Sequence, residues 1–152
     1  DGKGLYPVAV KYSEDLHSIG QFVQEGTPVL FETFLDIENP DEELILEADD
    51  VDDGFDYLNG ADLREVNRAA FLATFQAHSE RLPCVRLKIS ELNEYSFGQL
   101  FYFFEFACGV SGYLLGVNPF NQPGVESYKK NMFEMLGTPG FEKEREELLK
   151  RL

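Results

Sequence analysis

The alternation of apolar and polar positions divides the chain into short strands and longer helices. Runs of β-branched and aromatic residues predict strands, and apolar residues at helical spacing predict helices. The predicted strands are 5–12, 29–37 and 84–89, and the predicted helices are 13–26, 60–82, 94–116, 124–136 and 141–152. Because a strand, a helix and a strand follow one another at the start, the pattern predicts an α/β fold with helices covering a small, mainly parallel sheet.

Local signals support several of these elements. Ser13 can cap the first helix and Gly26 can end it. Apolar and basic residues alternate along 84–89, which predicts a strand with one wetter face. The helix at 94–116 is very apolar and is expected to be central.

Residues 38–56 contain no lysine or arginine. They are typical of a solvated surface excursion around a short Leu-Ile-Leu strand. A calcium-binding loop is the more specific alternative. However, in a loop that starts at Asp49 or Asp50, the carboxylates and the closing glutamate do not fall at the positions that calcium binding requires. We expect 1–136 to form one domain that includes this excursion, and 137–152 to form a C-terminal helix.

Composition narrows the classes of partner and cofactor. A net charge of −15 disfavours nucleic acid, because the phosphate backbone repels an acidic protein. The absence of a long apolar run predicts no membrane span. Cys84 and Cys108 are expected to be buried free thiols in a reducing cytoplasm. No zinc or nucleotide motif occurs, so neither a metal nor a cofactor is expected. Since Asp1 replaces an initial methionine, we expect a fragment or a processed product.

The segment 116–131 is unusually polar for its position between two apolar helices. It contains two prolines, three asparagines, a glutamine and a glutamate, a composition that indicates a site more than a connector. Pro123 suits the first turn of the following helix, and Asn121 or Gln122 can cap it.

Lys129 lies on the apolar side of that helix. At 3.6 residues per turn it falls within the arc of the apolar stripe, whereas Lys130 points outward. The stripe consists of Val125, Tyr128, Met132, Met135 and Leu136. One interpretation is that the Lys129 amine reaches water at the rim of the core. The other is that Lys129 and Gln122, both near one helix N-terminus, bind an oxyanion.

Histidine offers a second candidate for the site. His17 follows the first predicted strand near the start of a helix, a position where α/β folds gather ligands and where the imidazole tends to stay neutral. The alternative is a surface histidine that interacts with Asp15. His78, late in its helix, is explained by the helix dipole and is assigned no role. The stretch 108–112 is not a nucleophile elbow, because Tyr113 occupies the position that needs glycine.

These residues carry a family resemblance. Residues 112–133 match a C-terminal signature that reads aromatic, Asn or Asp, Gln, any residue, Gly-Val-Glu, two residues, Lys. Residues 1–26 look like the segment that brings the family's active-site histidine, and residues 102–126 look like its shorter, Gram-positive bacterial members. From end to end, the chain resembles the glucose-6-phosphate isomerase family. The signature residues are Phe120, Asn121, Gln122, Pro123, Gly124, Val125, Glu126 and Lys129.

The resemblance implies a fold, an activity and residue roles. The fold is a three-layer αβα sugar-isomerase-type domain with a mainly parallel sheet and extra C-terminal helices. The activity interconverts glucose 6-phosphate and fructose 6-phosphate, through ring opening and a cis-enediol, without a cofactor. His17 would help open the ring, Lys129 would lie at the ring oxygen and C1, and Gln122 would contact the substrate. The family is cytoplasmic and dimeric, with the histidine serving the neighbouring subunit's site.

The resemblance also implies what this chain lacks. The family's catalytic glutamate normally lies immediately before the position of Asp1, and the first sugar-isomerase domain with its phosphate loop is absent too. We therefore expect the C-terminal part of the enzyme, inactive without the N-terminal part. Two alternatives stay open: a non-catalytic sugar-phosphate-binding module of the same fold, and a structural interaction domain in which Lys129 faces outward.

Overall fold

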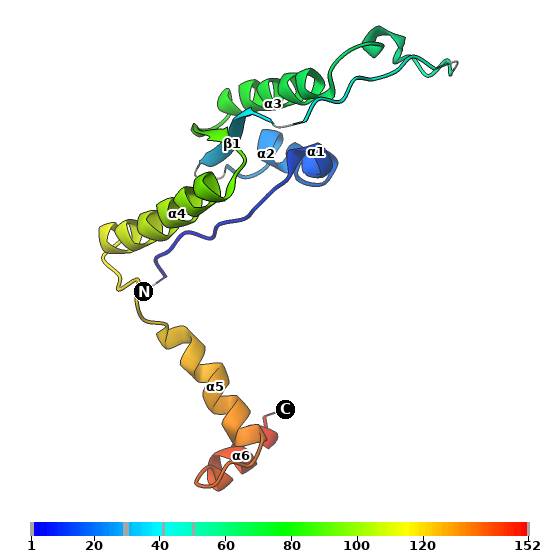
Figure 1. Ribbon diagram of the computed structural model, residues 1–152. Coiled ribbons are helices and arrows are strands. Elements are labelled where there is room, and N and C mark those ends of the chain that lie inside the picture. Colours follow the sequence, from blue (N-terminus) through cyan, green and yellow to red (C-terminus); the bar gives the residue numbers. More distant parts are fainter. Residues whose placement is uncertain (1, 29–30, 41, 50, 152) are drawn as a thin grey trace. The chain divides into compact units, whose positions relative to one another are not determined.

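The computed structural model describes residues 2–28, 31–40, 42–49 and 51–151 (Figure 1). The chain divides into two compact units, which are described separately below. One unit is Leu5–Phe103, and the other combines Asp1–Gly4 with Phe104–Leu152.

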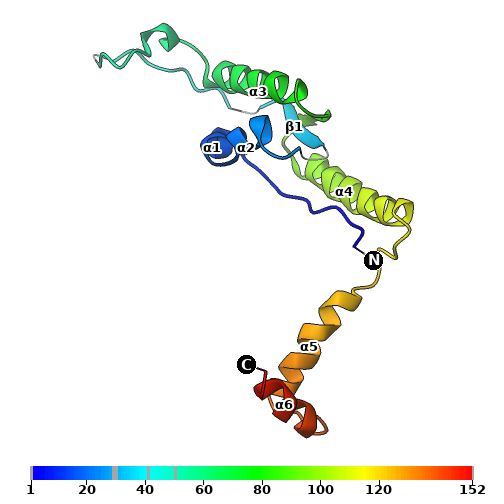
Figure 2. The same ribbon diagram turned by 180° about the vertical axis from the view of Figure 1, so that it is seen from behind.

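A two-stranded parallel sheet organises the first unit. Strand β1 (Glu32–Asn39) pairs with β2 (Cys84–Glu91), and Phe34 lies opposite Arg86 in the register. Helix α3 (Leu63–Ser79) connects the strands and lies beside β1 in both views (Figures 1 and 2). The predicted α/β class with a parallel sheet is confirmed, and so are the helix at 60–82 and the two later strands, apart from positions 29–30, which lie outside the described residues.

The predicted strand at 5–12 is wrong. In the fully described stretch 2–28, residues 2–11 form neither strand nor helix, and Tyr6 is 91% exposed. An apolar run becomes a strand only when a neighbouring strand pairs with its backbone, and among the described residues the sheet contains β1 and β2 alone. The parallel β-α-β unit is therefore β1, α3 and β2, not the one predicted for the first 37 residues.

The first predicted helix is present, with a wider turn in the middle. It consists of α1 (Tyr12–Asp15), the π-helical η1 (Leu16–Gly20) and α2 (Gln21–Glu25). Ser13 is not the cap: the N-cap is Lys11, whose backbone N–H donates to Asp15 at 2.8 Å. Gly26 ends the helix as predicted, and a Cβ there would lie 2.4 Å from the carbonyl oxygen of Phe22.

The described residues of the acidic excursion are exposed, as predicted, except for the half-buried Leu46. The expected Leu-Ile-Leu strand is reduced to one bridge between Ile45 and Asp62, followed by a short helix, η2 (Asp56–Leu58). The side chain of Asp49 accepts a hydrogen bond from the N–H of Val51, an Asx turn within this loop. Asp50, the other start considered for a calcium loop, lies outside the described residues.

Helix α3 begins at a cap and packs through its aromatic face. Asp62 accepts a hydrogen bond from the N–H of Arg64 at 2.9 Å, and the Arg64 side chain holds the pKa of that carboxyl below its ordinary value. Phe71 and Phe75 meet the ring of Phe34 edge-on, with centroids 5.9 and 5.2 Å away. Among the described residues, the buried apolar side chains are Val23, Phe34 and Leu82.

The predicted wetter face of the strand at 84–89 is confirmed at Lys88, whose side chain is 57% exposed, but not at Arg86. Arg86 faces α3, where it binds the buried carboxylate of Asp36. Because successive side chains of a strand point to opposite faces, Leu35 and Val85 lie on the other face. Both are exposed, Val85 by 52%. The basic face of β2 is therefore covered at Arg86 and exposed at Lys88, and the apolar face is open at Val85.

The second unit contains the end of α4 (Glu94–Leu114), then α5 (Pro123–Met135) and α6 (Glu142–Leu149). All three helices were predicted. The ring centroids of Phe133 in α5 and of Phe141, which precedes α6, lie 6.5 Å apart. The prediction that α4 is central is wrong, because most of its large apolar side chains are exposed. Its position depends on what covers it, which periodicity does not encode.

Two expectations drawn from composition, one on membrane spans and one on the cysteines, can be compared with the structure. Among the described residues, no helix has the length and hydropathy that a bilayer crossing needs. Cys84 and Cys108 are free thiols, as predicted, but Cys108 is exposed, not buried. Burial and the charge of Glu32 raise the pKa of the half-buried Cys84 thiol.

Candidate functional site

His17 lies in the π-helical turn of the first unit, and its side chain is exposed. A π-turn inside an α-helix is rare and frequently marks a functional position. The surface-histidine alternative pairs His17 with Asp15, but the Asp15 carboxylate accepts from the Lys11 N–H and the Ser18 hydroxyl. His17 is thus presented outward on a short helix with an uncommon backbone.

A buried polar network holds the start of this helix. The hydroxyl of Tyr12 donates to one oxygen of Glu32, and Nδ1 of His78 lies 2.8 Å from the other. His78 is 1% exposed, and its ring meets that of Tyr12 edge-on at 4.9 Å between centroids. Burial, and then the bond to Glu32, raise the pKa of Tyr12, so the phenol stays protonated and donates.

A shallow depression of about 340 Å³ is lined in part by residues that neighbour His17 in the sequence. Leu16 and Gly20 line one side, and Ala77 and His78 of α3 line the other. The depression is open and mostly apolar, so it is a groove between two helices and not an enclosed ligand cavity.

A second polar cluster lies under α3. Asp36, 2% exposed, accepts hydrogen bonds from Arg68 and from Arg86, the latter through Nε at 2.6 Å. Both guanidinium carbons lie near the ring of Phe71, at 5.5 and 5.7 Å from its centroid. A buried carboxylate shared by two arginines is expected to fix the geometry of the strand and helix that carry them.

Gln122 and Lys129 belong to the second unit. Pro123 is the first residue of α5, as predicted, and Gln122 is its N-cap residue without a side-chain cap bond. Lys129 is half-buried: its side chain is 42% exposed, and Nζ lies 2.8 Å from Glu126. Lys130 points outward, as predicted, towards Glu134 at 3.7 Å.

The apolar stripe of α5 is not covered in this unit, contrary to the prediction. Tyr128, Met132 and Leu136 are exposed, whereas Glu134 is the buried residue of the helix. The helical wheel correctly grouped the residues that share a side. Which side is covered depends on contacts that the wheel does not contain.

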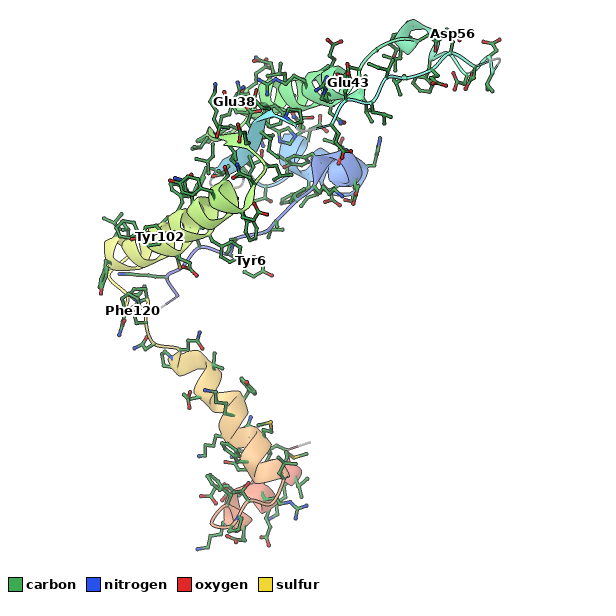
Figure 3. All side chains as sticks on the ribbon, viewed as in Figure 1. Tyr6, Glu38, Glu43, Asp56, Tyr102 and Phe120 are labelled. Atoms are coloured by element: carbon green, nitrogen blue, oxygen red, sulfur yellow. The ribbon has the colours of Figure 1, made fainter. Side chains whose placement is uncertain are left out.

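The turn that leads into α5 is tightly packed. Figure 3 shows Phe120 in this segment between α4 and α5. The N–H of Phe120 donates to the side chain of Asn118 at 2.9 Å, and Gly116 reverses the chain with φ of 72°. A Cβ on Gly112 would lie 2.8 Å from Cβ of Pro119. Gly112 is therefore the residue that lets the turn approach the helix.

Replacing Gly112 with alanine is expected to destabilise the turn that carries Gln122. Gly109 is the matched control, because it lies one turn earlier on α4 and a Cβ there meets nothing within 4 Å. Both changes gain the same helix propensity, so their difference isolates the clash. We expect G112A to be less stable than G109A by about 1–3 kcal/mol, measured by urea unfolding. Equal stability would contradict the packing described above.

Sequence reasoning missed Glu32, Asp36 and Tyr12. The signal was available for the two acids, because positions 32, 34 and 36 share one face of a strand, and that face also carries Phe34. An acid on an apolar face demands a cationic or hydrogen-bonding partner. The identity of those partners, on α3 and β2, is not encoded locally.

Comparisons with known proteins show which sequences this chain resembles. No family model matches the chain. Glucose-6-phosphate isomerase of Clostridioides difficile is 54% identical over 154 aligned residues, which cover 100% of this chain and 34% of the relative. The enzymes of Clostridium tetani and Clostridium perfringens are 50% and 53% identical over the same share.

A solved structure is similar as well. The crystal structure of a hypothetical protein from Thermus thermophilus matches with a TM-score of 0.76 and 27% identity, over 81% of this chain and 30% of that protein. The chain thus spans about a third of the length of the curated relatives it matches. Over its whole length, the sequence matches a segment of glucose-6-phosphate isomerase.

Proposed function

We propose that this chain is the C-terminal part of a cytoplasmic glucose-6-phosphate isomerase, which interconverts glucose 6-phosphate and fructose 6-phosphate. The observation that carries the proposal is the 50–54% identity with curated isomerases across the entire chain. The alignments cover the whole chain, so they include both the His17 segment and the Gln122–Lys129 segment, which supports a common reaction.

The proposed reaction needs groups that move protons and groups that stabilise charge. His17 opens the sugar ring by moving a proton to or from the ring oxygen, a role that suits an exposed imidazole. Lys129 stabilises negative charge near the ring oxygen and C1 through its cationic amine. Gln122, whose side chain does not cap α5, contacts the substrate. The C2 proton moves to C1 through a cis-enediol, for which a carboxylate base is required.

We propose that this base is a glutamate outside the present chain, as is the phosphate loop. None of the acids described above fits the role: Glu32 and Asp36 are engaged in the buried clusters, and Glu126 is paired with Lys129. The N-terminal part of the enzyme is accordingly a required partner. The complete enzyme is proposed to be a homodimer in which His17 serves the neighbouring subunit's site.

The same proposal extends the fold. The open apolar face of the sheet, with Leu35, Ile37 and Val85 exposed, supports a covering helix layer, and the outer edges of the two-stranded sheet can pair with further strands, as in a three-layer sugar-isomerase-type domain. In this assignment residues 1–136 belong to that domain, and 137–152 add a C-terminal helix.

Isomerase assays with two proteins test the proposal. The complete enzyme that contains this chain is expected to convert fructose 6-phosphate to glucose 6-phosphate, read through a coupled dehydrogenase. The 152-residue chain alone is expected to show no turnover above background, because base and phosphate loop are missing. An inactive complete enzyme would overturn the isomerase assignment, and an active isolated chain would overturn the proposed placement of the base.

A further inference from the structure

The helix that carries His17 is tied down at both ends. At its start, Tyr12 donates to Glu32 on β1, and at its end the carbonyl of Gly26 accepts from Arg81 at 3.1 Å. Between these ties the π-helical turn Leu16–Gly20 presents His17 to solvent, and beyond it Val23 is buried. The orientation of an exposed side chain on so short a helix depends on these ties, since helices of this length are not stable by themselves.

The tie at Tyr12 is the more elaborate of the two. Glu32 uses both carboxylate oxygens, one for the Tyr12 hydroxyl and one for Nδ1 of His78 at 2.8 Å. A carboxylate only accepts, so Nδ1 of His78 carries the proton that it donates. Glu32 begins β1 and His78 lies in the last turn of α3, so the network joins the start of the His17 helix to a strand and to a second helix.

Packing around the network limits its contact with water, since Tyr12 and Glu32 are partly buried. His78 is fully buried, and the Tyr12 ring stacks on Phe34 with centroids 5.8 Å apart. Hydrogen bonds to a charged group in such surroundings are stronger than those on the surface, and each lost bond leaves a buried polar group unsatisfied. These three side chains therefore give the His17 helix a defined position on the sheet.

We propose that Tyr12, Glu32 and His78 form a positioning network that fixes the π-helical turn and thereby directs His17 at the sugar ring. The role in catalysis rests on the proposed isomerase function; the anchoring of the turn does not. None of the three touches the substrate in this proposal: they act through His17.

Tyr12→Phe is the decisive variant, with Tyr57→Phe as its matched control. Y12F removes the hydroxyl but keeps the ring contacts with Phe34 and His78, whereas Tyr57 is exposed in η2, just beyond the acidic excursion. In the complete enzyme, amide hydrogen exchange of residues 16–20 is expected to be about tenfold faster in Y12F and unchanged in Y57F. Unchanged exchange in Y12F would overturn the anchoring.

The catalytic role is tested by a double-mutant cycle with His17→Ala. Y12F is expected to lower kcat about tenfold with little change in KM, because a misplaced catalytic group is felt in the rate. In the His17→Ala background Y12F is expected to have almost no further effect on kcat. An equal loss of kcat in both backgrounds would overturn the proposal, since Tyr12 would then act independently of His17.

The experiment also allows for a Y12F variant that does not fold and for a parent enzyme that is inactive. Should Y12F fail to fold, Glu32→Gln replaces it, because the amide NH2 that takes the place of one carboxylate oxygen cannot accept a hydrogen bond. An inactive parent enzyme would overturn the isomerase function, while the exchange measurement would still decide whether the network anchors the turn.

Discussion

Replacing Asp36 with alanine is expected to lower the free energy of unfolding by about 3 kcal/mol, a large share of the stability of an ordinary domain. Asp36 is 2% exposed and accepts hydrogen bonds from Arg68 and Arg86. Its removal leaves two guanidinium groups stacked on Phe71 without their counter-ion. Both guanidinium groups reach water in part, which places the loss at the lower end of the range for breaking a buried ion pair.

Glu38→Ala is the matched control for D36A. Glu38 lies two residues further along the same strand and pairs with Lys88 at 2.5 Å, but both side chains are well exposed. An exposed pair of this kind contributes at most about 1 kcal/mol. Urea unfolding of wild type, D36A and E38A under one set of conditions checks the difference. Similar losses in both variants would mean that the Asp36 cluster is ordinary surface electrostatics.

The same cluster shows where prediction from sequence stops. The strand at β2 was predicted from the alternation of apolar and basic residues, and that alternation is real. Lys88 is exposed, but Arg86 on the same face was wrongly taken as a wet residue, because its charge is matched by Asp36, fifty positions away. Periodicity identifies side chains that share a face, but only the tertiary partner decides which face is covered.

The wrong strand at 5–12 and the central position expected for α4 have the same cause. Both segments are apolar enough for a core, and both are exposed in their units, with Val8 and Phe97 as examples. Elements defined by local signals were predicted well: the cap positions at Pro123 and Gly26 and the helices beside them depend on neighbours a few residues away. A strand and a buried helix depend on surfaces far along the chain.

The residues of the candidate site also fall into those that the sequence predicted and those that it did not. His17, Gln122 and Lys129 stood out because their residue types and positions are unusual, and the resemblance gave them roles. Tyr12, Glu32 and His78 did not, because a tyrosine, a glutamate and a histidine far apart in sequence become a network only after the chain has folded. Residues that position a catalytic group carry weaker sequence signals than the group itself.

Replacing Lys129 with alanine in the complete enzyme is expected to lower kcat by about 100-fold, the size of effect seen when one stabilising group is lost from a developing oxyanion. The proposed role requires a cation near the ring oxygen and C1, and alanine supplies neither charge nor hydrogen bond. Lys129→Arg is expected to recover part of the rate, because it restores the charge with a different geometry. His17→Ala is expected to lose about 100-fold or more, as for removal of a general acid or base.

Lys130→Ala separates this role from the general effect of losing a lysine from α5. Lys130 is adjacent in sequence, is 62% exposed and pairs with Glu134 at 3.7 Å, so K130A removes the same charge from the same helix. We expect K130A to retain kcat within about twofold, because Lys130 has no proposed role in the reaction; the loss of its pairing with the buried Glu134 is expected to affect stability instead. Steady-state kinetics of the four variants decides the matter. If H17A and K129A keep wild-type turnover, the chain supplies binding and not catalysis, which is the behaviour of a sugar-phosphate-binding module. If K129A and K130A lose activity equally, the amine of Lys129 has no specific role in the reaction.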